Sequence, residues 1–425
     1  MSKGPAWLLE QLPALVRDGV LDDASAARLR AHYAPLAADA GAMSRVLFAT
    51  LGALLVGLGL ILLAAHNWDQ WGRGTRLFVS LLPLALSQGL LAWVLRRDAD
   101  GGWREAAAVF SALAFALALA MVGQVFHFPG DLGRYLAVCA ALTLPLVYVP
   151  GSALAAAVYG GAVLGSVLSM HGNAGAPLLV VAAFAVLVPY LWLLYRREGA
   201  TGTRLPLLLW ALAPLLFFAV LASLPDVPRL GLWWLAGFGA LLALGDSAAD
   251  AATAGPLWRR PLAAYGSLAV AAAALIGSFA DAWRGWPDAL GAVWQAWVLL
   301  FAVLGVVLWQ AIQAVRARRW VAALHGVPAL LMALVVAFDT RAWAVALAAM
   351  LSGFVLLLGV AMLRDGLQTR HWASASRGLF LLTLLVLLRF LDTDWSFTVR
   401  GLVFVGTGIA FIVASLWLRR RMAPP

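Results

Sequence analysis

The sequence predicts an all-α protein that crosses a membrane about fourteen times, with both termini in the cytoplasm. Three observations predict this fold class. The chain of 425 residues is 64% hydrophobic and only 12% charged, whereas a soluble domain has about 25% charged residues. Apolar runs of roughly 18–20 residues, the length that spans a bilayer core, recur along it. The arginines also collect on one side of these runs.

The first 45 residues predict a small helical hairpin, which precedes a transmembrane domain of residues 46–425. Apolar residues recur at helical spacing as far as Gly19, which ends the first helix. Asp22 is placed to cap a second helix. The module either lies against the inner membrane face or docks a cytoplasmic protein partner, and both interpretations stay open.

Fourteen apolar segments follow, and each is predicted to be a helical span because hydrocarbon offers no partner to an open backbone. Their approximate bounds are residues 46–65, 77–95, 106–126, 135–149, 152–170, 177–195, 205–223, 230–245, 261–280, 289–313, 321–337, 342–362, 378–391 and 401–418. Tight turns such as Pro150-Gly151 separate several neighbours. The number of spans is therefore fixed only to within one hairpin.

The orientation follows from the basic residues. With the N-terminus in the cytoplasm, the inner segments hold 22 of the 30 lysines and arginines and the outer loops hold 8. This excess is typical of cytoplasmic loops, so both termini are predicted to lie inside. The inner face should also attract anionic lipids. Nucleic acid is not predicted as a partner, because the charges lie in short loops between spans.

Small residues inside the spans predict close helix packing, since apolar helices gain little hydrophobic energy by meeting in lipid. A stripe of small residues at every fourth position runs along the segment 152–170, and the first and last spans share one glycine spacing. The glycines predicted to pack are Gly52, Gly59, Gly161, Gly165, Gly401 and Gly408.

Polar and aromatic residues gather at the outer ends of three spans and form a candidate ligand site. Its members are His66, Asn67, Trp68, Asp69, Gln124, His127, Asp131, Arg389 and Asp392. The competing interpretation is an interfacial aromatic belt with aspartates that cap helices. Arg389 favours a site, because a charge in an apolar span needs a partner. Asp392 on the same helix face and Asp69 from the first outer loop are the expected carboxylates.

Several kinds of chemistry are not predicted. The outer histidines and carboxylates do not fall at a metal-ligand spacing, so no metal site is assigned. Cys139 is the only cysteine, which excludes a disulfide within the chain. No Walker motif, serine nucleophile elbow or cofactor motif is present, so neither a cofactor nor a catalytic residue is assigned. No Asp, Glu or Lys lies near the middle of a span, which disfavours ion-coupled transport.

Two motifs carry a resemblance to a known family. The first span ends in Ala-His-Asn-Trp-Asp, and residues 123–131 read Gly-Gln-Val-Phe-His-Phe-Pro-Gly-Asp. With the helical N-terminal module, they resemble the bacterial membrane-protein family called domain of unknown function 2157. Arg-Phe-Leu-Asp at residues 389–392 and the glycine-rich last span resemble the tail of the same and related families. The resemblance implies a bacterial inner-membrane protein and supplies no activity.

Three functional hypotheses remain. The first is a membrane protein that binds or transports a small or lipidic ligand through the polar site at the periplasmic ends. The second is an integral-membrane transferase acting on a lipid-linked substrate, with Asp69 as its catalytic carboxylate by analogy. The outer loops are short for such an enzyme, so an enzyme is the less favoured class. The third is a scaffold or sensor whose N-terminal module is the output. A cavity that reaches the middle of the membrane would favour the first.

Overall fold

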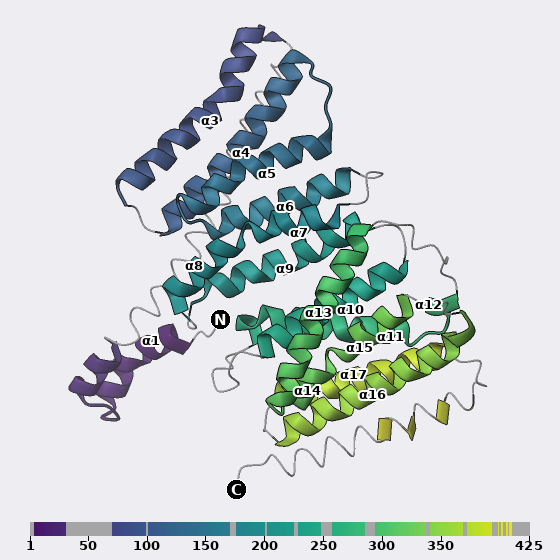
Figure 1. The fold of residues 1–425 in the computed structure, drawn as a ribbon. Helices are drawn as coiled ribbons and strands as arrows, with labels where there is room; N and C mark the ends of the chain where they lie inside the picture. Colours follow the sequence, from purple (N-terminus) through teal and green to yellow (C-terminus); the bar gives the residue numbers. More distant parts are fainter. Residues whose placement is uncertain are drawn as a thin grey trace. The chain divides into compact units, whose positions relative to one another are not determined.

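A computed structural model shows this protein as an assembly of helices (Figure 1). It describes residues 4–30, 70–98, 101–170, 176–199, 202–224, 228–247, 257–284, 294–336, 341–368 and 372–392, with a few more between 398 and 409. Every regular element in these residues is helical, as predicted. The predicted first span, 46–65, lies outside them, and so does most of the last, 401–418.

The chain divides into two compact units, Met1–Val79 and Ser80–Pro425. The boundary predicted between residues 45 and 46 falls outside the described residues and stays a prediction.

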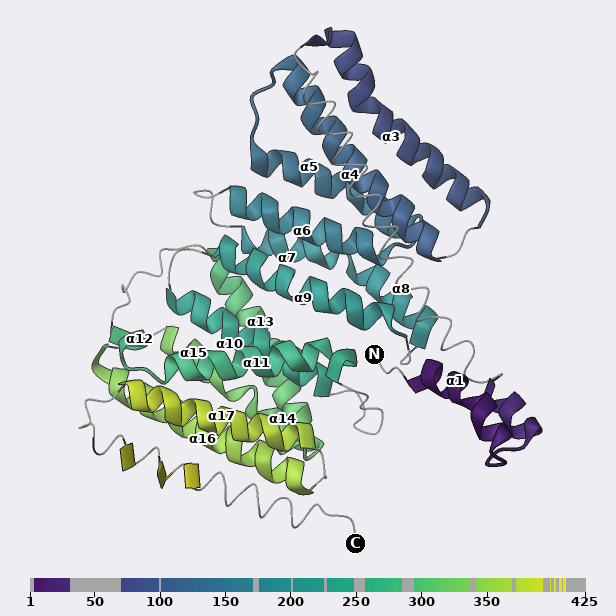
Figure 2. The ribbon, with the colours of Figure 1, turned by 180° about the vertical axis from the view of Figure 1, so that it is seen from behind.

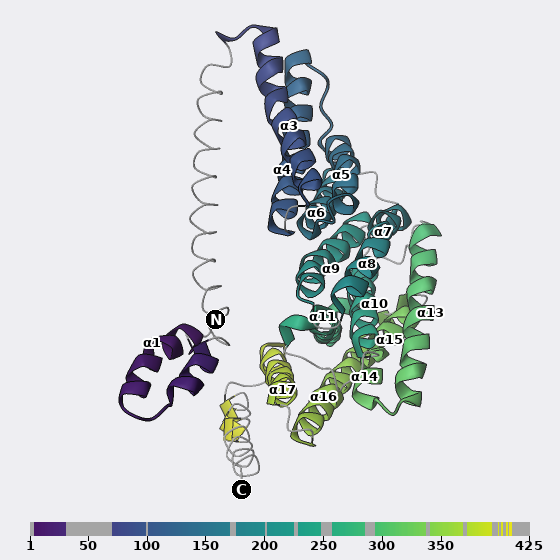
Figure 3. The same cartoon turned by 90° about the vertical axis from the view of Figure 1, so that its left-hand side faces the viewer.

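The first unit contains the predicted helical hairpin (Figure 3). Helix α1 (Gly4–Arg17) is followed by a second helix over residues 23–30. Gly19 has a φ of 70°, a left-handed conformation that glycine adopts without strain, and it ends the first helix as the sequence predicts. Leu12 and Ala26, one from each helix, are buried and form the small core.

Asp22 begins the second helix of this hairpin. Its carbonyl accepts the backbone N–H of Ala26 at 3.0 Å. The hydrogen bond between its carboxylate and Ser25 lowers the pKa of Asp22, as expected where the ionised form is the acceptor at a helix start. The predicted cap is confirmed.

The remaining described helices run from α3 to α17. They are α3 (Arg73–Arg96), α4 (Gly101–Phe126), α5 (Leu132–Tyr148), α6 (Ala153–Ser169), α7 (Pro177–Ala185), α8 (Val188–Glu198), α9 (Arg204–Ser223), α10 (Pro228–Ser247), α11 (Pro261–Gly277), α12 (Asp281–Arg284), α13 (Trp294–Arg316), α14 (Trp320–Leu324), α15 (Val327–Val336), α16 (Ala344–Gln368) and α17 (Trp372–Asp392). Short 3₁₀ turns precede α11 and α16.

Six helical stretches in the described residues are long and apolar enough to cross a membrane. They are Arg73–Arg96, Gly101–Phe126, Pro177–Glu198, Arg204–Ser223, Trp294–Arg316 and Ala344–Gln368. Five shorter apolar helices have 10–17 residues, and α5 and α6 are among them. Each predicted span inside the described residues coincides with one helix or with two consecutive helices. The number fourteen and the side of the termini stay predictions.

The helices of the second unit are packed in a series (Figures 1 and 2). Helix α5 packs between α4 and α6, α6 packs on α9, and α9 meets α11. Helix α11 pairs with α10 and contacts α16, which pairs with α17. The buried residues form one continuous apolar core along this series, from Leu91 to Leu385.

Glycines mediate the tightest of these contacts, although not those that the sequence singled out. A side-chain carbon at Gly239 of α10 would lie 2.8 Å from the backbone nitrogen of Val270 in α11. At Gly378 of α17 it would lie 2.6 Å from the carbonyl oxygen of Gly359 in α16. Glycine is required there because any side chain would meet backbone, which cannot move aside.

The stripe predicted on α6 lies in a helix contact at Gly165 but not at Gly161. Gly161 is exposed, and a side-chain carbon there would meet no described atom within 4 Å, whereas one at the adjacent Gly160 would lie 3.1 Å from Leu212 of α9. A side-chain carbon at Gly165 would lie 2.9 Å from Leu136 of α5, so this glycine does lie in a contact. Gly401 and Gly408 have no described neighbour within 4 Å, and Gly52 and Gly59 lie outside the described residues.

Candidate functional site

The described part of the predicted outer site is the connection between α4 and α5. Gln124 and His127 are exposed there, and His127 has a φ of 53° where α4 ends. Asp131 accepts the backbone N–H of Arg134 at 2.9 Å and caps α5. Asp131 therefore has the capping role that the competing interpretation assigned to it. His66, Asn67, Trp68, Asp69 and the side chain of Asp392 lie outside the described residues.

Arg389 of α17 is half-buried and is bonded to oxygens at the end of α11 and in α16. It donates to the carbonyl oxygen of Ser278, the residue that caps the C-terminus of α11, and to the hydroxyl of Ser352 in α16 at 3.0 Å. Its guanidinium also lies 5.3 Å from the ring centre of Phe279. A cation at a helix C-terminus is stabilised by the free carbonyls and by the helix dipole. The carboxylates expected to pair with Arg389, those of Asp392 and Asp69, lie outside the described residues, so that pairing stays a prediction.

Arg389 and the α4–α5 connection are not brought together. Helix α17 packs on α16, while α4 and α5 pack on each other and on α6. Helices α6, α9 and α11 follow one another between these two regions (Figure 2). Asp131 and Arg389 therefore do not form one site, because a similar depth in the membrane does not imply adjacency.

A cavity of about 450 Å³ lies instead between α5, α6, α7 and the C-terminal end of α9. Its lining consists of Ala137, Ala140, Ala141, Leu144, Tyr159, Val163, Ser166, Val167, Met170, Ala176, Leu179, Val180, Ala183, Ala222, Ser223 and Leu224. None of these described residues carries a charge. The cavity runs along α6 from Met170 to Tyr159, roughly 16 Å at the rise of an α-helix. That is about half the thickness of a bilayer core.

The hydroxyl groups in this lining are bound to backbone carbonyls. The Ser166 hydroxyl donates to the carbonyl of Gly133 at 2.8 Å, and the Ser223 hydroxyl donates to that of Val220 at 2.7 Å. Their protons are therefore used within the protein. The cavity presents an apolar surface with a few hydroxyl oxygens.

A break in the helical span of α7 and α8 borders the cavity. Pro189 has no backbone N–H, and the two helices are separated at Val186-Leu187. The N–H of Leu187 donates to the carbonyl of Phe184 at 3.0 Å. In a regular α-helix it would donate to the carbonyl of Ala183, which is therefore left without its helical donor. The hydroxyl of Tyr159 on α6 donates to this carbonyl at 2.8 Å. An open backbone inside a membrane is tolerated only where the protein satisfies it in this way.

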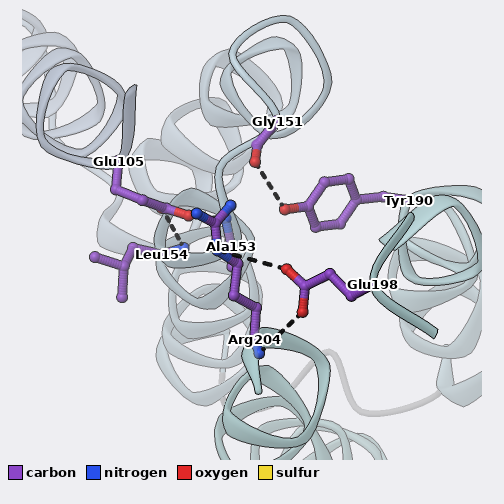
Figure 4. Close-up of polar contacts among 7 residues, drawn as sticks. All are labelled: Glu105, Gly151, Ala153, Leu154, Tyr190, Glu198 and Arg204. Carbon is purple, nitrogen blue, oxygen red and sulfur yellow. Dashed lines mark hydrogen bonds and ion pairs between the residues drawn. The ribbon is translucent and has the colours of Figure 1, made fainter. Parts of the chain in front are cut away.

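A polar cluster lies at the opposite end of the same helices (Figure 4). Glu105 of α4 accepts the backbone N–H groups of Ala153 and Leu154, both at 2.9 Å, and the hydroxyl of Ser152. These N–H groups form the N-terminus of α6, where a carboxylate is favoured by the helix dipole. One signal of this contact is present in the sequence, a glutamate directly before an apolar span.

Arg204 and Tyr190 complete this cluster. Arg204 of α9 lies 3.5 Å from the carboxylate of Glu198, and its side chain extends toward Glu105 (Figure 4). Tyr190 of α8 donates to the carbonyl of Gly151 in the α5–α6 turn at 3.0 Å. Gly151 has a φ of 71°, which a residue with a side chain rarely adopts. The cluster thus joins α4, α6, α8 and α9 at one end.

A second charged cluster joins five segments that are far apart in the sequence. A cavity of about 200 Å³ is lined by Asp246, Arg260, His325, Asp365 and Arg377, among others. Arg260 Nε donates to Asp246 at 2.8 Å. His325 is buried at a second interrupted span, between α14 and α15, and its Nδ1 donates to the carbonyl of Val321 at 2.9 Å. Pro189 and Pro328, each inside a predicted span, were the sequence signals of these two interruptions.

The comparison with protein families agrees with the resemblance carried by the N-terminal motifs. Residues 13–156 match the family described as predicted membrane protein (DUF2157). With the apolar helices above, this establishes a multi-pass membrane protein. No curated protein and no solved structure matches the chain.

The DUF2157 region ends within α6. It includes Glu105 and the helix N-terminus that Glu105 caps, and it includes the α5 wall of the apolar cavity. Arg204, Arg389 and the cluster around His325 lie beyond residue 156, so the match with DUF2157 does not reach them.

Proposed function

We propose that this protein binds an elongated apolar ligand, such as a lipid acyl chain, in the cavity between α5, α6, α7 and α9. The observation that carries this proposal is a cavity of about 450 Å³ with an uncharged lining that extends to the middle of α6. Burying a charged group there would cost far more than burying a hydrocarbon chain. The length of the cavity, roughly 16 Å, suits a chain of about a dozen methylene groups.

The interrupted span gives the cavity a means to respond to its occupant. In membrane transporters, discontinuous helices commonly form the binding site near the middle of the bilayer. Ala183, whose carbonyl is freed by the interruption, lines the cavity itself. A ligand in the cavity would therefore contact α7 next to the point where α7 and α8 could change their relative angle. This position favours transport or release of the ligand over permanent storage.

The proposed setting is the inner membrane of a bacterium, with about fourteen spans and both termini in the cytoplasm. The arginine-rich ends then face the cytoplasm and attract anionic lipids, and the cavity lies in the periplasmic half of the membrane. The N-terminal hairpin is exposed to the cytoplasm, where it is available to a protein partner. The polar outer residues border the membrane surface above α4 and α5.

Photolabelling tests the proposed cavity. Purified protein in nanodiscs is treated with a diazirine-bearing palmitate, and the labelled peptides are mapped by mass spectrometry. Labelling should concentrate on α5, α6 and α7. Ala137→Trp places an indole in the cavity. A ligand that shares the cavity with this indole should lose roughly 1–3 kcal/mol of binding free energy through overpacking. Labelling should therefore fall by about tenfold.

Val138→Trp is the matched control, because Val138 is the next residue of α5, is exposed, and does not line the cavity. It should leave the labelling unchanged. Equal labelling of both variants, or labels spread evenly over all apolar helices, would show that the palmitate contacts only the lipid-facing surface.

A further inference from the structure

A second cavity, of about 380 Å³, lies at the opposite end of the same helices and differs in its chemistry. Its side chains come from α4, α5, α8 and α9 and include Arg104, Tyr148, Tyr190, Arg197, Glu198 and Arg204. Three guanidinium groups and one carboxylate therefore face it. This balance leaves a net charge of about +2 in the described lining, which suits an anion.

The ion pairs that the arginines of this cavity already make compete only weakly with such an anion. Arg104 pairs with Asp98, whose side chain is 89% exposed, and Arg204 pairs with Glu198 while remaining 48% exposed itself. Exposed pairs contribute about 0–1 kcal/mol. The side chain of Arg197 makes no hydrogen bond or ion pair with another described residue. The guanidinium groups of Arg197 and Arg204 can thus turn to a ligand at little cost.

The walls of the cavity are fixed by contacts that do not use these arginines. The carboxylate of Glu105, which does not line the cavity, accepts backbone N–H groups and holds the N-terminus of α6. The hydroxyls of Tyr148 and Tyr190 donate to the carbonyls of Val186 and Gly151. A cavity held in shape before a ligand arrives loses less conformational entropy on binding.

Exposed tryptophans place this cavity at the level of lipid headgroups. Trp93 and Trp103 are about half-exposed and pack edge to face with ring centres 5.9 Å apart, next to Arg104. Trp192 is also exposed, and Arg196 stacks on it at 4.2 Å. Exposed tryptophans with adjacent arginines are typical of the membrane–water interface.

We propose that this cavity binds a phosphate-bearing group, and that its occupant in the membrane is the headgroup of an anionic phospholipid. Arg197 is the arginine most available to the phosphate, and Arg104 and Arg204 flank it. Guanidinium groups suit this task because their planar N–H groups match the geometry of phosphate oxygens. The site is separate from the apolar cavity, so its test does not depend on the outcome for the function proposed above.

The test measures lipid binding to the delipidated full-length protein by native mass spectrometry. Phosphatidylglycerol is compared with phosphatidylcholine, whose headgroup has no net charge. Arg197→Gln should weaken phosphatidylglycerol binding by about tenfold, the effect of one lost charge-assisted hydrogen bond. Arg196→Gln removes the same charge from the adjacent residue, which stacks outside the cavity, and should change binding by less than about twofold.

Glycerol 3-phosphate distinguishes the two sources of phosphate. If it displaces the lipid, the cavity recognises the phosphate ester alone. If it does not, the lipid is the ligand and its glycerol and chains contribute. Either result, with the loss confined to Arg197→Gln, supports the phosphate site. Equal weakening by both variants, or no preference for phosphatidylglycerol over phosphatidylcholine, overturns it. Should Arg197→Gln aggregate on size exclusion, Arg104→Gln takes its place in the same comparison.

Discussion

At the scale of single residues, one contact is repeated: a side chain donates a hydrogen bond to a backbone carbonyl at the end or the interruption of a helix. Arg389 donates to Ser278 at the end of α11, Tyr159 donates to Ala183, and His325 donates to Val321. Each carbonyl lies where a helix stops or breaks and lacks a regular donor. In hydrocarbon such a carbonyl has no water to bind. The hydrogen bond from the side chain therefore pairs both the donor and the carbonyl and stabilises the fold.

The clearest residue-scale prediction concerns Arg389. Arg389→Gln shortens the side chain and should withdraw it from Ser278 and Ser352, lowering the free energy of unfolding by about 1–3 kcal/mol because buried oxygens lose their donors. The change is measured as the midpoint of unfolding in a denaturing-detergent titration.

Arg134→Gln is the control for this change, since Arg134 is 84% exposed and pairs only loosely with Asp131 at 3.8 Å. It should lower the free energy of unfolding by less than about 1 kcal/mol. An equal shift for the two variants would mean that Arg389 is solvated rather than held between α11 and α16.

At the scale of elements, the fold depends on pairs of helices whose backbones touch and on spans that break. The α10–α11 and α16–α17 pairs meet through glycine and alanine, where a few tenths of an ångström decide the contact. The interruptions in α7–α8 and α14–α15 each border a cavity. Closely packed pairs supply rigidity, and the interrupted spans are the places where the backbone can bend.

Gly378 provides the element-scale prediction. Gly378→Leu should prevent close packing of α17 on α16, because its first side-chain carbon would already lie 2.6 Å from the carbonyl of Gly359. The expected loss is at least about 1–3 kcal/mol. It is measured as the yield of folded protein in membranes and its melting temperature in detergent.

Gly353→Leu is the matched change in α16, where Gly353 is exposed and has no described neighbour within 4 Å. It should be neutral or slightly stabilising, since leucine favours a helix over glycine by nearly 1 kcal/mol. If Gly353→Leu were as damaging as Gly378→Leu, the contact surface of α16 would have to lie on its other side.

At the scale of the whole molecule, sequence order is largely preserved in space within the second unit. Helices α4, α5, α6 and α9 are neighbours, and α10, α11, α16 and α17 follow them. The apolar and the arginine-lined cavities lie at different depths of the first group. The cluster around His325 lies in the second group. Neighbouring helices can thus form separate sites in one chain.

Orientation is the whole-molecule prediction. Reporter fusions after Arg197, Arg319 and Arg421 should report a cytoplasmic location, and fusions near Asp131 and Asp288 should report a periplasmic one. The basis is the arginine excess on the inner side. Alkaline phosphatase and fluorescent-protein fusions give complementary signals at each position. A periplasmic signal at the C-terminus would require an odd number of spans.

The sequence alone determined the membrane class, the helical segments and the hairpin turn at Gly19, since these depend on local composition and spacing. The twelve predicted spans inside the described residues correspond to helices because an apolar run in lipid has no other way to satisfy its backbone. Asp131 and Asp22 were likewise recognisable as caps from their immediate neighbours.

Only the tertiary structure decided which helices touch and which polar residues meet. Asp131 and Arg389 share a predicted depth yet lie in different helix groups, whereas Arg104, Arg197 and Arg204 converge on one cavity. Gly160 rather than Gly161 meets α9, because the rotation of α6 about its axis is set by packing and not by a repeat of small residues. Helix formation is local, but the choice of neighbour depends on contacts between segments distant in the chain, which spacing along one helix does not specify.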